Sequence, residues 1–415
     1  MRRTTWMLLA LMVCAPMSAG AFAQGNGTPE LVAGNTAFAL DLYAAVRQTA
    51  DGNLLVSPYS VSQALAMTYA GAGGETAAQM AETLSFGLPQ PALHEAFGAL
   101  NADLVARGTA KDDPEQGQTA RALHIANALW GEQTYPFSRS YSAQLTRYYG
   151  AGLHESDFVN APEETRGEIN DWVAEQTEDH IQDIVPEGAI TPATRLVLAN
   201  AIYFYGGWQD SFSPGSTSDG DFFLRDGTTA TVPFMVQHVH LPYRRGEGFQ
   251  VIEFPYAGSG FALTVILPDE GQFDAVEQGL DAAALNAAIG QLADTDVLVY
   301  LPKFKFEFGA SLAKTLRAMG MTDAFDPARA DFNGMVEGTP PEPLFIGDVL
   351  HKAFISVDEN GTEAAAATIV GMAGAAAPAP TQPTEVRIDR PFVFAIRDTQ
   401  TGTLLFVGRV MNPSA

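Results

Sequence analysis

The segment of residues 358–368 places the strongest constraint on this chain. It begins with acidic residues, passes the turn-prone pair Asn360 and Gly361, and continues into four alanines. Alanine favours a helix, but Gly371 and Gly374 interrupt any longer helical run. As an extended strand, the segment would instead present one face of small side chains, namely Thr362, Ala364, Ala366, Thr368 and Val370. It therefore predicts either a flexible alanine-rich linker or a strand that can enter between strands already packed together.

The first residues are typical of an export signal. Two arginines form a positive end, residues 6–15 form a short apolar core, and small residues follow. A transmembrane anchor fits this stretch less well, because the apolar run is too short and breaks at Pro16. We expect a signal peptide at residues 1–23 and a mature chain of residues 24–415 that is exported, either to the periplasm or as a secreted protein.

Cysteine content and charge limit the chemistry and the partners. Cys14 is the only cysteine, so the mature chain has no disulfide or thiolate chemistry. Its preceding residues are a poor lipidation signal, because a small residue should stand before the acceptor. The formal net charge is -25, and removal of residues 1–23, which carry two arginines and no acid, moves it to -27. Such acidity argues against nucleic acid and anionic membranes, and it favours solubility and a cationic partner.

The chain is predicted to form one large domain. Length alone suggests two or three domains, but the sequence shows no long linker, composition break or internal repeat. The most linker-like stretch, residues 108–119, is short and polar. We interpret it as a surface loop between a helix and a strand.

Helical patterns dominate the first half of the chain, and strand patterns dominate the second. Apolar residues recur at helical spacing in residues 31–48, Ser57 and Pro58 begin another helix, and Asn160 begins a third with capping-box spacing. The later signals are a buried strand at 196–205, a hairpin of 249–255 and 260–267, a strand region at 297–308 and a helix at 312–319. This order favours an α+β fold over an alternating parallel sheet.

The sequence contains no clear pattern of an enzyme or a cofactor site. None of the seven histidines lies in a His-Glu-x-x-His motif, and residues 309–313 miss the last glycine of a Gly-x-Ser-x-Gly elbow. No glycine-rich phosphate loop with a lysine is present. His238 and His240 could share a strand face and hold a metal, but neither a cysteine nor an acidic ligand stands near them in the sequence. We predict no enzymatic activity, no metal and no cofactor.

Six segments resemble motifs of the serpin family and occur in that family's order and spacing. Residues 359–368 resemble the reactive-loop hinge of inhibitory serpins. The others are the second-helix signature at 53–60 and 71–76, the central-strand motif at 198–208, the strand feeding the hinge at 349–354, and the closing strands at 390–394 and 405–413. Together they cover about residues 32–413.

The resemblance implies the serpin fold, a single large α+β domain with three β-sheets, a helical N-terminal half and an exposed reactive-centre loop at about residues 359–386. The hinge residues are then Glu359, Gly361, Thr362, Glu363, Ala364, Ala365, Ala366, Ala367 and Thr368. The shutter and breach positions, which control opening of the main sheet in that family, are matched by Ser57, Ser60, Asn200, His351 and Trp208. By resemblance, the first four form a buried polar cluster, and the tryptophan marks the entry point of the loop.

The resemblance further implies an irreversible suicide-substrate inhibitor of serine proteases. Such an inhibitor traps the protease as an acyl-enzyme while the cleaved loop enters the main sheet. The family's spacing of sixteen residues beyond Glu359 puts the reactive bond between Ala375 and Ala376. The loop is longer than usual in the family, so counting back from Pro391 gives a different bond, and we place the bond within residues 372–377.

Loop composition predicts the class of protease. No lysine or arginine occurs between residues 361 and 386, and the residues near the expected bond are small, which favours an elastase-like or subtilisin-like enzyme. The expected partner is thus a serine protease bound covalently by a monomer, with no nucleic acid and no membrane after signal removal. The alternative is a non-inhibitory serpin that serves as a carrier, storage or chaperone protein. Bulky or charged residues at positions 362–368 would be typical of that alternative, and within this range only Glu363 is charged.

Overall fold

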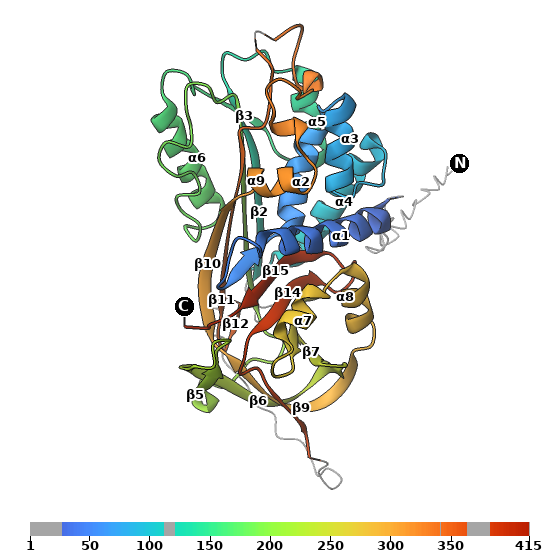
Figure 1. Ribbon diagram of the computed structural model, residues 1–415, viewed down its shortest axis with the longest axis vertical. Coiled ribbons are helices and arrows are strands. Elements are labelled where there is room, and N and C mark those ends of the chain that lie inside the picture. Colours follow the sequence, from blue (N-terminus) through green and yellow to red (C-terminus); the bar gives the residue numbers. More distant parts are fainter. Residues whose placement is uncertain (1–26, 112–120, 341, 363–381, 415) are drawn as a thin grey trace, which may run out of the picture.

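The computed structural model describes residues 27–111, 121–340, 342–362 and 382–414 (Figure 1). The helices are α1 Thr28–Val46, α2 Pro58–Tyr69, α3 Gly74–Thr83, α4 Gln90–Gly108, α5 Arg139–Tyr149, α6 Pro162–Gln176, α7 Phe273–Gln278, α8 Ala282–Ile289 and α9 Ala313–Ala318. In the part of the chain that is described, no helix is both long and apolar enough to span a membrane. The expected signal peptide lies outside these residues.

The strands of the first half and the middle of the chain are β1 Leu54–Val56, β2 Arg121–Glu132, β3 Leu153–Ser156, β4 Leu196–Gly207, β5 Ser218–Phe223, β6 Thr229–Arg245, β7 Phe249–Pro255 and β8 Phe261–Pro268. Those that follow are β9 Ala293–Pro302, β10 Phe304–Ser311, β11 Asp348–Val357, β12 Gly361–Thr362, β13 Thr384–Arg387, β14 Phe392–Asp398 and β15 Leu404–Val410. Helices and strands are thus segregated as an α+β fold requires.

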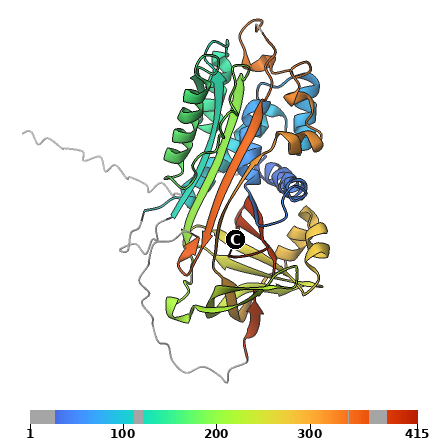
Figure 2. The ribbon, with the colours of Figure 1, turned by 60° about the vertical axis from the view of Figure 1, so that its left-hand side comes forward.

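A six-stranded sheet with the order β10-β11-β12-β4-β2-β3 runs along the long axis of the molecule (Figures 1 and 2). β4 and β11 pair in parallel, and the last of their pairs joins Ile202 to Ala353. Beyond that pair, β12 lies between the two strands, and Thr362 pairs with both Gly206 and Val357. We call the boundary between β4 and β11 the seam. Direct β4–β11 pairing closes the seam from Val197 to Ile202 of β4. At the other end of the seam, the described hinge residues Gly361 and Thr362 lie between the two strands.

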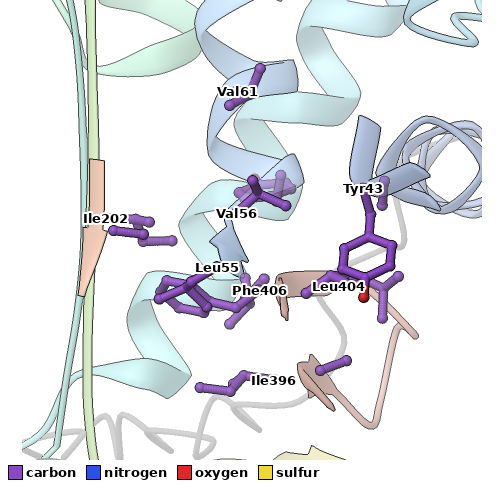
Figure 3. Packing of buried hydrophobic residues seen from close by; sticks show 14 of the residues in the cluster. Tyr43, Leu55, Val56, Val61, Ile202, Ile396, Leu404 and Phe406 are labelled. Atoms are coloured by element: carbon purple, nitrogen blue, oxygen red, sulfur yellow. The ribbon is translucent and has the colours of Figure 1, made fainter. Parts of the chain in front are cut away.

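The two faces of this sheet are covered differently. α6 packs on one face, which we call the outer face, where Ile169 and Val173 join a small core with Ala199, Ala201 and Phe354. The opposite, inner face belongs to the main core together with α1, α2 and the second sheet. Figure 3 shows Ile202 of β4 on one side of this core, Leu55, Val56 and Phe406 in the middle, and Leu404 of β15 with Tyr43 of α1 on the other side.

The remaining strands form a nine-stranded network with the order β1-β15-β14-β8-β7-β6-β9-β13, and β5 pairs with β6. β6 is seventeen residues long, and it pairs with β5 over residues 229–234, with β9 over residues 234–243 and with β7 over its last three residues. The three sheets expected from the resemblance are therefore present as the six-stranded sheet and two smaller sheets that β6 joins.

Several local predictions agree with this structure. The apolar run at 196–205 is the central strand β4, which is buried nearly throughout, and the expected hairpin is β7 with β8. Ser57 caps α2, where its side chain accepts a hydrogen bond from the amide of Ser60, and Pro58 follows in the first turn. α2 is buried on all sides, because it lies between two sheets, so its sequence needs no polar face.

Two local predictions are wrong in detail. The strand region at 297–308 is two strands in different sheets, because β9 ends at Pro302, which has no N–H to extend its ladder, and β10 begins after Lys303. Asn160 does not cap α6, since the residue before the helix is Ala161, without a side-chain cap. The backbone and side-chain amides of Asn160 instead donate to Asp157, at 2.8 and 3.0 Å.

Candidate functional site

The first residue of the small-residue face, Thr362, is already inside the six-stranded sheet. Its side chain is 2% exposed, and its Oγ1 lies 2.5 Å from the hydroxyl of Tyr256. Tyr256 in turn stacks on Trp208 with ring centroids 4.8 Å apart. A short polar side chain is thus accommodated in a pocket lined by aromatic rings. The strand interpretation of this segment is therefore realised at its first position.

Gly361 allows this seating because the backbone of β4 passes very close to it. A Cβ atom at residue 361 would lie 2.1 Å from the carbonyl oxygen of Gly206 and 2.8 Å from the Cα of Gly207. Backbone atoms cannot move aside as a flexible side chain can. Glycine at position 361 therefore lets the hinge pair this closely with β4.

Backbone hydrogen bonds fix the turn that leads into β12. Trp208 donates from its amide to the carbonyl of Asn360 at 2.8 Å, and from its indole Nε1 to the carbonyl of Asp358 at 2.9 Å. The amide of Phe212 donates to the carbonyl of Glu359 at 2.9 Å. Trp208, expected at the loop's entry point, therefore holds the turn that directs the hinge into the sheet.

Glu359 anchors the same turn through its side chain. It is 8% exposed, and it accepts hydrogen bonds from Lys303 Nζ and Thr217 Oγ1, both at 2.7 Å. Burial opposes ionisation, but the hydrogen bonds from Lys303 and Thr217 outweigh it, and the pKa of Glu359 lies below its ordinary value. Lys303 is the residue at which the strand region at 297–308 divides, so the break in that region supplies the cation for the hinge.

The structure brings together the four residues expected in a polar cluster, Ser57, Ser60, Asn200 and His351. The amide of Ser57 donates to His351 Nε2 at 3.1 Å, so this nitrogen is unprotonated, and Nδ1 donates its proton to Asn200 Oδ1 at 2.5 Å. Burial lowers the pKa of His351 to about 4. Because Asn200 and His351 are paired across the seam, this neutral histidine links β4 to β11.

Two members of the cluster were missed by sequence reasoning, Asn127 and Gln63. Asn200 Nδ2 donates to Ser60 Oγ at 2.6 Å and also to Asn127 Oδ1, while Asn127 Nδ2 donates to Gln63 Oε1 at 2.7 Å. The cluster therefore joins α2, β2, β4 and β11. The available signal was the side-chain amide of Asn127 inside the apolar run of β2, since a buried polar group needs hydrogen-bond partners.

The other expected site residues fall on segments without a described structure. Glu363, Ala364, Ala365, Ala366, Ala367 and Thr368 of the hinge, and Ala375 and Ala376 of the reactive bond, lie outside the described residues.

His238 and His240 do share one exposed face of β6, and the fold brings to them acids that are distant in the sequence. His238 Nε2 lies 2.7 Å from Asp296, and His240 Nδ1 lies 3.4 Å from Asp294, both on β9. These are exposed histidine–carboxylate contacts, a kind of surface contact that contributes little to stability. Among the residues that the structure describes, no group of three or more His, Cys, Asp or Glu side chains is arranged to hold a metal ion.

Gly361→Ala is expected to displace the hinge from the sheet, because the added methyl group would overlap the carbonyl of Gly206. Hydrogen exchange at residues 358–362 should become faster than in the parent, and Trp208 fluorescence should change. Gly309→Ala on β10 of the same sheet is the matched control, since its nearest non-bonded atom would lie at 3.7 Å, an ordinary contact. Unchanged exchange in Gly361→Ala would show that close approach to β4 does not limit the hinge.

Acid is expected to release the same turn. Since the pKa of Glu359 is lower in the folded protein than its ordinary 4.5, its contribution is complete above pH 4.5 and is lost as the pH falls through the folded value. Trp208 fluorescence, followed from neutral pH downward, should show a transition below 4.5. In Glu359→Gln, which is neutral at every pH, this transition should be absent; its persistence would assign the acid effect to another group.

Comparisons with known proteins agree with this geometry. The serpin (serine protease inhibitor) family profile matches residues 33–413. Leukocyte elastase inhibitor of Sus scrofa is 40% identical, covering 92% of this chain and all of that protein, and antithrombin-III of Mus musculus is 37% identical, covering 92% and 82%. The native thermophilic serpin tengpin, at 31% identity, superposes with a TM-score of 0.81, covering 93% of this chain and 94% of tengpin. Human thyroxine-binding globulin, at 28% identity, gives a TM-score of 0.82, covering 93% and 99%. The chain belongs to the serpin family.

Proposed function

We propose that this serpin is an irreversible suicide-substrate inhibitor of serine proteases, with residues 359–386 as its reactive-centre loop. The observation that carries the proposal is the position of Thr362 as the first rung of a strand between β4 and β11. Serpin loop insertion is the established example of strand addition, and a seam that can accept a strand begins next to this residue. Relatives named leukocyte elastase inhibitor and antithrombin-III support an inhibitory role.

Inhibition begins as ordinary proteolysis. The protease serine Oγ attacks the loop carbonyl, the peptide C–N bond breaks, and the amine leaves with the proton taken from the serine and delivered by the protease histidine. An ester bond then joins the loop to the protease. If the freed segment enters the sheet before water hydrolyses this ester, the protease moves with the loop and is trapped. The outcome is a race between insertion and deacylation.

The register of β12 predicts where the inserted residues would lie. Continued without a break, antiparallel pairing to both strands ends at residue 371, opposite Val197 and Asp348. The seam thus offers partners for residues 362–371, a length of about 33 Å as a strand. The expected bond lies a few residues further on, so the cleaved end would reach the far end of the sheet.

The same register matches the side chains to the two faces. Residues on the face of Thr362 would enter the inner core, where their small size fits a packed interior. Thr368 would come between Asn200 and His351, and its hydroxyl could replace the hydrogen bond that is lost when the strands part. Glu363 would face the outer side, which suits a charged side chain.

Insertion is expected to stabilise the protein. It replaces the single ladder between β4 and β11, which has six residue pairs, by two longer ladders on either side of the new strand. The intact form is then held kinetically above a more stable inserted form. The buried cluster of Asn200 and His351 contributes to the barrier, because its hydrogen bond crosses the seam.

The proposed class of target protease and the proposed location of the inhibitor rest on the sequence. Small residues and the absence of lysine and arginine from residues 361–386 favour an elastase-like or subtilisin-like protease, and a relative named leukocyte elastase inhibitor supports this class. Residues 1–23 would direct export, so the monomeric inhibitor would meet its target in the periplasm or outside the cell.

Elastase treatment is expected to give a denaturant-resistant covalent complex and a cut between Ala375 and Ala376. The reason is that these small residues fit an elastase-like pocket, whereas trypsin lacks a charged anchor in the loop. Intact mass analysis should place the cut within residues 372–377. Elastase with its catalytic serine chemically blocked is the control and should form no covalent complex. Complex formation with trypsin but not elastase would contradict the specificity.

Thr362→Arg is expected to convert the inhibitor into a substrate. Thr362 is already buried in the resting sheet, so an arginine at this position would be expelled from the seam before cleavage. Insertion would then have to bury an unpaired charge, at a cost of about 3–5 kcal/mol. If most of this cost is added to the free-energy barrier to insertion, insertion slows by roughly a hundredfold or more. Deacylation is then faster than insertion, and the protease is released. The measurement is the number of inhibitor molecules consumed per protease inactivated. Glu363→Arg is the matched control, because its side chain would face the outer side after insertion. The number of inhibitor molecules consumed per protease should therefore change little in this variant. Equal ratios for Thr362→Arg and the parent would rule out hinge insertion.

A carrier, storage or chaperone role is the alternative, because human thyroxine-binding globulin, solved in complex with thyroxine, shares this fold. The same protease experiment separates the two. A non-inhibitory serpin would be left intact or cut without complexes by every serine protease in a panel.

A further inference from the structure

A row of aromatic and basic side chains crosses the outer face of the six-stranded sheet. His124 of β2 lies 6.0 Å from Tyr203 of β4, measured between ring centroids. The ring of His180, from the loop after α6, stacks on Tyr203 at 4.3 Å and lies 5.9 Å from the ring of Phe354 on β11. Lys305 Nζ of β10 lies 5.2 Å from the Phe354 ring. His180 is the member of this row that does not belong to the sheet, and it bridges the seam.

His180 lies at the point where the closed part of the seam ends. The last β4–β11 pair is Ile202 with Ala353, and Tyr203 and Phe354 are the next residue on each strand. The histidine ring therefore covers the first position beyond the last β4–β11 pair. Insertion in the register of β12 would bring Ala365 to this position, with its side chain on the outer face under His180.

The loop that carries His180 is tied down on both sides. Thr177 Oγ1 accepts the amide of Ile181 at 3.1 Å, and Lys352 of β11 donates to the carbonyl of Gln182 at 2.7 Å. Further along, Asn170 of α6 exchanges two hydrogen bonds with the backbone of Val185, at 3.1 and 2.9 Å. The placement of the ring over the seam is thus built by contacts with both α6 and the sheet.

The backbone around His180 is strained. Glu178, Asp179 and Asp183 have φ angles of 51°, 63° and 50°, and within the described residues the remaining non-glycine residue with positive φ is Ser85. Such conformations persist only where the surroundings enforce them. The contacts of the loop with α6 and the sheet therefore hold this turn in place over the seam.

We propose that His180 is a positioning residue for loop insertion: its neutral ring keeps the seam closed ahead of the hinge, and protonation releases the ring and speeds insertion. The inference rests on the proposed inhibitory function. In this proposal, His180 controls the entry of residue 365 between β4 and β11. The cluster around His351 acts later, further along the seam.

The charges around His180 give the direction of the pH effect. Burial against the rings disfavours the imidazolium, Glu178 and Asp179 of the same loop favour it, Lys305 opposes it, and the pKa of His180 lies below its ordinary value. Glu178 also contacts His124, since its Oε1 lies 3.5 Å from Nε2 of that histidine. A proton therefore binds more tightly once the ring has left the seam, so acid favours the open seam.

The inserting loop adds to this effect. Glu363 would arrive on the outer face, two residues before Ala365 in the same strand, so its carboxylate would attract a protonated His180. Cation–π attraction to Tyr203 and Phe354 acts in the opposite direction and would hold the charged ring in place. The sign of the pH dependence decides between these two effects.

A peptide with the sequence of residues 363–375 tests the proposal without any protease. Its incorporation into the intact protein can be followed by native gel and mass spectrometry between about pH 8 and about pH 5, the range of histidine titration. The parent rate should rise severalfold as the pH falls. His180→Phe, which keeps a stacked ring but cannot titrate, should be slow at both pH values, and His180→Ala should be fast at both.

His154→Phe is the matched control. His154 of β3 also stacks on the outer face, with its ring 4.4 Å from Trp130, but it lies away from the seam. This variant should keep the pH dependence of the parent. A parent rate that falls in acid, a pH dependence that survives in His180→Phe, or failure of the peptide to enter His180→Ala would overturn the proposal. Absence of covalent protease complexes with an intact peptide pH profile would instead overturn the inhibitory function alone.

Discussion

The parallel pairing of β4 with β11 is the contact on which the rest of this structure depends. It closes the centre of the six-stranded sheet with only six residue pairs, although each strand is longer than that. The unpaired end is filled by Gly361 and Thr362, which make the first two positions of a further strand. A sheet that is complete at one end and prepared for an insertion at the other explains why so many unusual residues gather along this line.

Three sets of contacts hold the seam in its resting state, and each lies at a different position along it. At the entry, Glu359 and Trp208 fix the turn into β12 through an ion pair and backbone hydrogen bonds. His180 lies over the position next to the last β4–β11 pair. Within the paired region, Asn200 and His351 are joined by a buried hydrogen bond. In the proposed mechanism, a strand that enters from β12 would meet them in this order, and each would contribute a part of the barrier.

Sequence patterns predicted the parts of the fold that depend on local signals. The apolar run of β4, the start of α2 at Ser57 and the hairpin of β7 and β8 follow from periodicity and capping, and the six motifs indicated the family. Residues that act through long-range pairing were missed. Asn127 and Gln63 join the buried cluster, and Tyr256 receives Thr362, only because distant strands and helices are brought together. No spacing along the chain could show these contacts.

The hinge illustrates the same limit. The face of small side chains at strand spacing predicted a segment able to enter a sheet, with a flexible linker as the alternative, but it could not show that Thr362 is seated before any cleavage. That seating depends on Gly361, because the backbone of residues 206 and 207, more than a hundred residues away, passes so close that a Cβ atom at residue 361 would overlap it. His180 also gains its importance from tertiary structure, since its stacking partners lie on strands that separate at that point.

The stability of the protein before and after cleavage of the loop tests the central claim most directly. The loop would be cut by a protease that is not trapped, and the melting temperatures of the intact and nicked proteins would be compared under the same conditions. Insertion of residues 362–371 as a new strand predicts a clear rise in melting temperature after nicking. A melting temperature that stays the same or falls would mean that the seam does not accept the loop, and it would contradict the account.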